Sequence, residues 1–326
     1  AFDLMILKGG PGVGKNTFMR EIGKTMEQAG ADVEYLWCSG DPDSLDGVAV
    51  PAIRCAICDG TSPHIVEPKY PAAVDRYVDL GRFYDLPAAK AQAAEVKRHT
   101  HDYQDAYARA YRCLKAARQV ELDTAAEIRQ CFDSQRAARR ISGIMARELR
   151  GRGTGTGRIT RRFLGSVTHK GPVWRFDSAE TLCSKIYELE DSYEQAGGLL
   201  SALCAEAVRR SYDVIACPSP EEPERLEHLL IPELGVAFVT SKPGMEYPGK
   251  PYRRVRLNAL SHPESKARLR FRSRMAGVLR EEGVAALQDA KAAHDRLESV
   301  YNPYVDFEGV RAQAAIEAGR LLSWLN

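Results

Sequence analysis

The chain lacks any long apolar run. No stretch of 18 consecutive apolar residues occurs among its 326 residues, which argues against a membrane-spanning helix. It also lacks a recognisable signal peptide, because the strand-like run 4–7 begins almost at once. The first residue is Ala1 rather than Met, and we expect that a segment ahead of it is missing. We therefore expect a cytoplasmic protein with no membrane partner.

An excess of charge of one sign is absent as well. The chain has 46 Lys and Arg against 44 Asp and Glu, a formal net charge of +2. This balance offers no general argument for a polyanionic partner, so nucleic acid is not expected to bind. Hydrophobic residues make up 44%, enough for ordinary globular cores, and the length favours two domains.

The eight cysteines lack the regular spacing of a disulfide framework. Cys55 and Cys58 form a C-x-x-C, but no second pair follows at zinc spacing. They lie in an apolar run, where cysteine behaves as a small hydrophobe. We therefore predict reduced thiols, with burial favoured over a metal or redox role.

The most informative stretch is 4–17. An apolar run suited to a buried strand is followed by a glycine-rich turn, a lysine and a helical pattern. This order matches the phosphate-binding loop G-x-x-x-x-G-K-[ST]. Glycines let backbone N–H groups point at a phosphate, and the helix N-terminus favours the same anion. The residues predicted to bind the nucleotide are Gly9, Gly10, Pro11, Gly12, Val13, Gly14, Lys15, Asn16 and Thr17.

One position departs from the loop pattern. Asn16 stands where Ser or Thr would offer Mg²⁺ a hydroxyl, and Thr17 follows one residue later. An Asn carbonyl oxygen is also a hard ligand, so Asn16 is retained as a candidate. Lys15 is expected to reach the outer phosphates.

Asp59 follows a second apolar run, where ligands bind in parallel sheets. We predict Lys15 and Asp59 as catalytic residues, and Asn16, Thr17 and Asp59 as Mg²⁺ ligands. Asp59 could instead cap a helix or a turn. His64 could contact substrate, although a structural role is favoured.

Periodicity predicts an α/β fold. Apolar residues at helical spacing predict a helix over 18–30, and strand patterns cover 32–38 and 53–58. This order predicts a P-loop NTPase parallel sheet with right-handed crossovers and flanking helices. The first nucleotide-binding core is assigned to 1–86.

The segment 87–150 is predicted to be helical. Tyr103, Tyr107 and Tyr111 recur at helical spacing, which favours a buried seam over a base-stacking surface. From Arg136 to Arg162 there are nine arginines against one acid. This basic stretch could hold phosphate or nucleic acid, but a solvated hinge with a linker at 151–160 is favoured.

The second half repeats the first with a shift of 181 residues, which relates Asp32-Val33 to Asp213-Val214. We predict a second core at 161–262 and a second helical segment at 263–326. The shift places Ala196 at the lysine position and Thr240 at the Asp59 position. Acids also line the second loop, so this copy is predicted not to bind nucleotide.

The stretches 7–15, 46–51 and 59–64 resemble a little-characterised bacterial family of tandem P-loop proteins. These proteins are described as ATPases or as nucleotide-kinase-like, and 227–234 resembles their second-half motif. The resemblance covers nearly the whole chain and implies a P-loop fold and ATP binding, with no known substrate. The chain departs from the family at Asn16, where Ser is usual, and in the lost second loop.

Three functions remain open at this point. The first is a Mg²⁺-dependent ATPase with one active site. The second is a small-molecule or nucleotide kinase, because the loop and Asp59-Gly60 resemble adenylate kinase, although no matching arginine-rich lid is visible. The third is a non-enzymatic nucleotide sensor or scaffold, which Asn16 and the degenerate copy favour.

Overall fold

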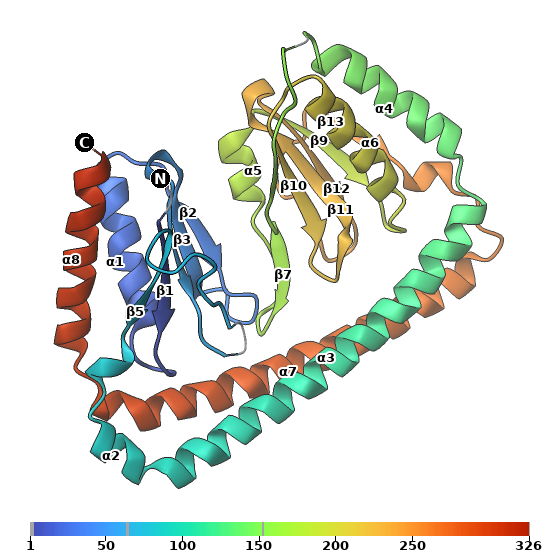
Figure 1. Ribbon diagram of the computed structural model, residues 1–326. Helices are drawn as coiled ribbons and strands as arrows, with labels where there is room; N and C mark the ends of the chain where they lie inside the picture. Colours follow the sequence, from blue (N-terminus) through green and yellow to red (C-terminus); the bar gives the residue numbers. More distant parts are fainter. Residues whose placement is uncertain (1–2, 63–64, 152, 326) are drawn as a thin grey trace. The chain divides into compact units, whose positions relative to one another are not determined.

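The computed structural model describes residues 3–62, 65–151 and 153–325, and it divides into two compact units (Figure 1). Unit 1 comprises residues 1–109 and 285–326, and unit 2 comprises residues 110–284. The domains predicted from the sequence follow one another along the chain, and their boundaries differ from those of the two units. The helical segments 87–150 and 263–326 each contribute to both units, because the helices at their ends pack on different sheets.

Unit 1 contains a five-stranded sheet in the order β2-β3-β4-β1-β5. Its strands are β1 (Asp3–Lys8), β2 (Glu34–Trp37), β3 (Leu45–Val50), β4 (Cys55–Asp59) and β5 (Asp75–Asp79). Strand β1 pairs parallel with β4 and β5, whereas β3 pairs antiparallel with β2 and β4. The prediction of a parallel sheet is therefore wrong for β3. The connections on either side of this strand are too short for the crossover of about a dozen residues that parallel strands need.

One face of this sheet is covered by two helices from opposite ends of the chain, α1 (Lys15–Gln28) and α8 (Phe307–Leu325) (Figure 1). Helix α1 buries Phe18, Ile22 and Met26, whose spacing places them on one side. Helix α8 adds Val310 and Leu321 to the same core. Unit 1 therefore needs a segment that follows the second core in the chain.

The remaining regular elements of unit 1 surround this layer. The last turns of the long helix α7 (Lys266–Tyr301) precede α8, and α2 (Leu86–Ala91) leads into the long helix α3 (Ala93–Gln130). Within unit 1 these two long helices contact each other through an ion pair between Arg109 and Asp289. The 3₁₀ turns are η1 (Pro51–Ile53), η2 (Gly81–Phe83) and η5 (Asn302–Tyr304).

Unit 2 contains a six-stranded sheet in the order β13-β9-β12-β11-β10-β6. Its strands are β6 (Ile159–Arg161), β9 (Lys185–Glu190), β10 (Val214–Ser219), β11 (Glu222–Ile231), β12 (Val236–Ser241) and β13 (Arg253–Arg256), with a separate hairpin β7 (Gly165–Thr168) and β8 (Gly171–Trp174). Apart from β6, this sheet has the same strand order and directions as that of unit 1. Helix α6 (Ala196–Arg209) also starts 181 residues after α1, the shift found in the sequence.

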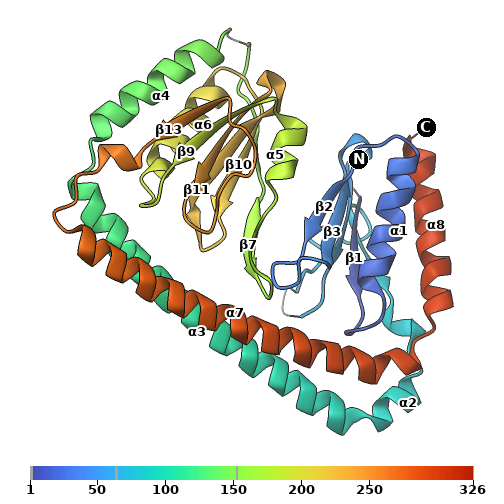
Figure 2. The ribbon, with the colours of Figure 1, turned by 180° about the vertical axis from the view of Figure 1, so that it is seen from behind.

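Helix α4 (Ser134–Glu148) packs beside α6 in unit 2, as the reverse view shows (Figure 2). Its Ala137, Ile141 and Ile144 enter the core, and the Asp133 side chain caps it by accepting from the Arg136 amide at 2.9 Å. The other elements are α5 (Phe176–Leu182), η3 (Pro232–Leu234) and η4 (Asn258–Leu260). No helix in the described part of the chain is both long and apolar enough to cross a bilayer.

Candidate functional site

The glycine-rich loop joins the end of β1 to the start of α1. Gly9, Gly12 and Gly14 have φ angles of 155°, 75° and 93°, which L side chains rarely adopt. Gly14 precedes the first helical residue, Lys15, and no side chain caps this helix. Within the described residues, no acceptor faces the backbone amides of 15–17. The loop therefore presents donors at a helix N-terminus, as a phosphate site requires.

The Lys15 ammonium lies inside this loop. Its Nζ donates to the carbonyl oxygens of Gly9 at 2.8 Å and Gly10 at 3.1 Å. Asp59 Oδ2 lies 3.6 Å from the same nitrogen. Burial lowers the pKa of Lys15, and the Asp59 carboxylate opposes this shift. Lysine and aspartate are thus brought together as the sequence predicted.

Asp59 occupies the carboxyl end of β4, next to Leu7 of β1 in the parallel register. Its Oδ1 accepts from the Thr61 amide at 2.9 Å and from the Thr61 hydroxyl at 2.6 Å. This is an aspartate-stabilised turn, the alternative considered from the sequence. The two oxygens have different partners, since Oδ1 holds the turn while Oδ2 faces Lys15.

Asn16 faces away from the position of a metal ligand. Its Oδ1 accepts from Arg20 Nε at 3.0 Å and from the Leu45 amide at 3.2 Å. An amide oxygen that already accepts two hydrogen bonds does not fit direct Mg²⁺ coordination. Thr17 lies exposed on the first turn of α1. Asp59 is therefore the predicted ligand whose carboxylate fits Mg²⁺ or a metal-bound water.

The outer side of the loop rests on the end of α7 and on η5. A Cβ added at Gly12 would lie 2.6 Å from the Asn302 amide and 3.3 Å from the Glu298 carbonyl oxygen. With Nδ2 facing the loop, Asn302 donates to Gly12 O at 3.2 Å and to Glu298 O at 3.1 Å. Tyr84 donates to Pro11 O at 2.8 Å. Sequence reasoning missed these supports, because no local motif links the loop to residues almost 300 positions away.

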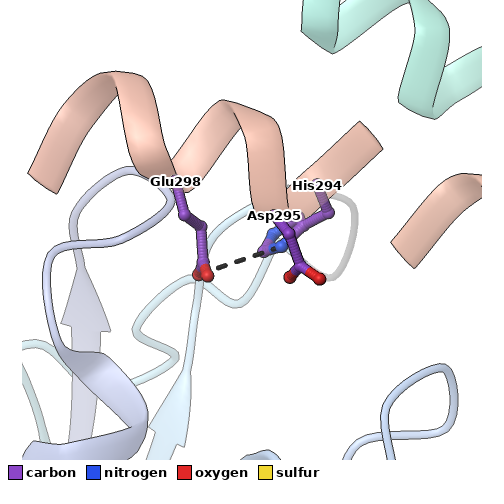
Figure 3. Close-up of side chains that lie close together, drawn as sticks. All are labelled: His294, Asp295 and Glu298. Atoms are coloured by element: carbon purple, nitrogen blue, oxygen red, sulfur yellow. Dashed lines mark ion pairs between the residues drawn. The ribbon is translucent and has the colours of Figure 1, made fainter. Parts of the chain in front are cut away.

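A group of polar side chains on α7 lies beside this support (Figure 3). His294 Nδ1 and Glu298 Oε1 are 3.8 Å apart. With a carboxylate oxygen of Asp295 they form a group of three possible ligand atoms that lie within 4.8 Å of one another. Asp295 is paired with Lys291 at 2.5 Å. Glu298 also favours the charged form of Lys15. We assign no metal here, and the group places negative charge near the loop.

The equivalent loop of unit 2 is occupied by its own acids. Asp191 Oδ1 accepts from the Gln195 amide at 2.9 Å, and Oδ2 accepts from the Ala196 amide at 2.7 Å. Asp191 is only 4% exposed, and burial raises its pKa. A carboxylate therefore sits at the N-terminus of α6, where unit 1 has unpaired amides. Thr240, at the Asp59 position, is buried at the end of β12.

Glu194 adds a second internal anion to this loop. It accepts from Arg118 Nη1 at 2.7 Å and lies 3.3 Å from both Arg225 and Lys242. These cations lower the pKa of Glu194 to about 2 against the cost of burial. An open cleft of about 550 Å³ beside Arg225 is also lined by Glu222 and Glu224. The three cations around Glu194 are therefore already paired within unit 2.

The remaining candidate residues from the sequence are either partly or fully buried in the fold or lie outside the described residues. Cys55 and Cys58 are free thiols on β4, and burial raises their pKa values to about 12 and about 11. His228, within the resemblance motif, is fully buried and its Nδ1 accepts from the Thr240 amide at 3.1 Å. His64 lies outside the described residues.

Comparisons with family models, curated proteins and solved structures find no match to this chain.

Proposed function

We propose that unit 1 is a P-loop nucleotide-binding unit that binds ATP with Mg²⁺ and hydrolyses it. The observation that carries this proposal is the position of Lys15 Nζ, inside the glycine-rich loop and 3.6 Å from Asp59 Oδ2. Asp59 ends β4, and Lys15 begins the helix that follows the loop after β1, the adjacent parallel strand. This is the edge at which ligands bind in α/β sheets.

The loop residues have separate roles in this proposal. The amides of 15–17 bind phosphate oxygens, and Lys15 exchanges its contacts with the Gly9 and Gly10 carbonyls for the outer phosphates. Asp59 Oδ2 holds Mg²⁺ or a water bound to it. Mg²⁺ supplies charge neutralisation on the phosphates when bound. The protein contributes mainly positioning and electrostatic stabilisation, as phosphoryl transfer requires.

We further propose that unit 2 is a degenerate copy of the same fold. The matching strand order, matching directions and the 181-residue offset of α6 from α1 support this proposal. Asp191 then takes the place of a bound anion. Eight free cysteines favour a reducing compartment, and we place the protein in the cytoplasm.

A nucleotide sensor without turnover is the second candidate, and the geometry of Asn16 favours it. The side chain that replaces the usual hydroxyl ligand is held by Arg20 and by the Leu45 amide. Metal coordination then depends on Asp59 and water, which weakens the case for rapid hydrolysis. The kinase alternative gains no specific support from the described contacts.

Calorimetric titration of ATP with Mg²⁺ tests the site, and a turnover assay tests the reaction. Lys15→Ala is expected to abolish ATP binding, whereas Lys24→Ala, on the exposed side of α1, leaves it unchanged. Unchanged affinity in Lys15→Ala would refute the site. Ala196→Lys, combined with Lys15→Ala, is expected to restore no binding.

Turnover separates the functions. Hydrolysis by the unaltered chain without an acceptor supports the ATPase. Turnover only with an added acceptor, such as a nucleoside monophosphate, supports a kinase. Binding without turnover under either condition supports the sensor.

A further inference from the structure

The near-zero charge of the whole chain conceals a strong difference between its units. Unit 2 contains 30 Lys and Arg against 22 Asp and Glu, a formal net charge of +8. Unit 1 contains the remaining 16 basic and 22 acidic residues, a formal net charge of −6. The sequence-wide argument against a polyanionic partner therefore does not apply to unit 2.

Part of this positive charge lies on one surface, which we call the arginine face: Arg136, Arg140 and Arg147 of α4, Arg253 of β13, and the adjoining Tyr252. Arg253 is on the α4 side of the sheet, because Val255, two positions along β13, packs in the core that α4 covers. The three α4 residues are spaced four and seven apart, so they share one side of the helix. Arg140 Nη1 donates to the Arg256 carbonyl oxygen at 3.4 Å, which connects the helix to the edge strand β13.

The other end of the arginine face is connected through Tyr187. Arg147 Nη2 donates to the Tyr187 hydroxyl at 3.1 Å, and the Tyr187 and Tyr252 rings are 5.4 Å apart. Arg253 is the register partner of Tyr187 in the sheet. Helix α4, β9 and β13 therefore present these side chains on one surface, and Arg136 to Arg147 span about 17 Å along the helix axis.

The positive charge of this surface is only partly compensated, because Arg147 is its one member paired with an acid among the described residues, Glu148 at 3.1 Å. Arg136, Arg140 and Arg253 are exposed, and none forms an ion pair with any other residue that the structure describes. Arg280 of the same unit, by contrast, is paired with Glu121 at 2.8 Å. Uncompensated arginines suit bidentate contacts to phosphate.

Tyr252 gives the surface an aromatic contact. Its side chain is 56% exposed, and Lys185 Nζ lies 5.6 Å from the ring centroid. An exposed aromatic ring beside arginines suits a strand with unstacked bases. An anionic membrane is a poorer fit, because Tyr252 is the one large exposed hydrophobic residue on this face among the described residues.

We propose that the arginine face of unit 2 binds a single nucleic-acid strand. Phosphates of the strand contact Arg136, Arg140 and Arg253, and one base stacks on Tyr252. The binding does not depend on the proposed ATP site of unit 1.

Fluorescence anisotropy of the full chain tests this proposal with labelled 15-nucleotide oligothymidylate and oligouridylate. Measurements at 50 to 200 mM NaCl give the salt dependence. We expect binding that weakens with salt, and the preferred oligonucleotide shows whether the chain favours DNA or RNA of this composition. Arg136→Gln/Arg140→Gln should weaken binding at least about tenfold and lower the salt slope by about 1.4, or about 0.7 per lost phosphate contact.

Two further variants separate base stacking from charge. Tyr252→Ala should weaken binding by about tenfold, and Tyr252→Trp should retain it, because stacking needs an aromatic ring. The matched control, Arg296→Gln/Arg311→Gln, removes two exposed charges from unit 1 and should leave affinity unchanged.

No binding of either oligonucleotide at 50 mM NaCl would overturn the proposal, and so would equal losses in the control and the Arg136/Arg140 variants. Vesicles containing phosphatidylserine provide the last comparison. Arginine-dependent binding to these vesicles without binding to oligonucleotides would assign the face to a membrane instead. Circular dichroism of each variant confirms that it is folded.

Discussion

Replacing Gly12 by alanine tests how the end of α7 supports the glycine-rich loop. Gly12 has a φ of 75°, so a Cβ at this position costs about 1–2 kcal/mol in backbone strain. The new atom would also lie 2.6 Å from the Asn302 amide and force it to move. This movement breaks hydrogen bonds to the Gly12 and Glu298 carbonyl oxygens, each worth about 1 kcal/mol. We therefore expect Gly12→Ala to lower the free energy of unfolding by about 3 kcal/mol.

Gly30→Ala is the matched control. Gly30 has a φ of 85°, but an added Cβ meets nothing within 4 Å. Gly30→Ala therefore introduces the backbone strain without the clash and should lower the free energy of unfolding by about 1 kcal/mol. Urea unfolding measures both values, and titration of ATP shows whether the loop still binds. Equal destabilisation by the two variants would refute the support of the loop by Asn302.

A double-mutant cycle with Asn302→Ala separates the backbone strain at Gly12 from the clash with the Asn302 side chain. In that background the side-chain clash at Gly12 is absent, whereas the Glu298 carbonyl oxygen still lies 3.3 Å from the new Cβ. Gly12→Ala should then cost about 1–2 kcal/mol, mostly strain. A cost as large as in the unaltered chain would show that Asn302 does not contribute.

Three further perturbations have definite expected outcomes. Asn16→Ser should lower the free energy of unfolding by about 1–2 kcal/mol, because it removes the acceptor for Arg20 and the Leu45 amide, and urea unfolding measures this loss. The same variant should raise Mg²⁺-dependent turnover in a phosphate-release assay, and an unchanged rate would show that the hydroxyl is not limiting. Glu194→Gln should cost about 3 kcal/mol at pH 7, with Glu206→Gln, on the surface, costing under about 1 kcal/mol. Because the pKa of Glu194 in the folded chain is lowered to about 2, the stabilisation by its carboxylate is present above about pH 4.5 and is lost as the pH falls towards 2. The unfolding free energies of Glu194→Gln and the unaltered chain should therefore converge near pH 2, and a difference that stays constant with pH would contradict this role of Glu194. Tyr84→Phe removes the hydroxyl that donates to Pro11 O and should lower the free energy of unfolding by about 1 kcal/mol. An unchanged urea unfolding curve would count against that contact.

Local features were accessible from the sequence because neighbouring residues create them. The order of β1, loop and α1 follows from an apolar run, four glycines and Lys15 within 15 residues. The 181-residue offset reappears in the starts of α1 and α6. Asp59 was placed at the end of its strand for the same reason.

Features that depend on distant segments were not accessible. The antiparallel position of β3 follows from short connections and pairing partners, which apolar patterns do not specify. The orientation of Asn16 depends on the Leu45 amide, 29 residues away. Arg136 and Arg140 lie on a helix, as predicted for 87–150, but the hinge interpretation of the arginine-rich stretch did not foresee that this helix lies beside β13.

By itself, the sequence determined the order of strand, glycine-rich loop with Lys15 and helix, and the 181-residue offset to a second helix that starts at Ala196. Only the tertiary structure decided what surrounds each loop. In unit 1, packing brings Asn302 against Gly12, and in unit 2 it buries Asp191 at the N-terminus of α6. The physical reason is that backbone conformation and helix starts depend on local residues, whereas support and charge compensation depend on which distant segments share a core.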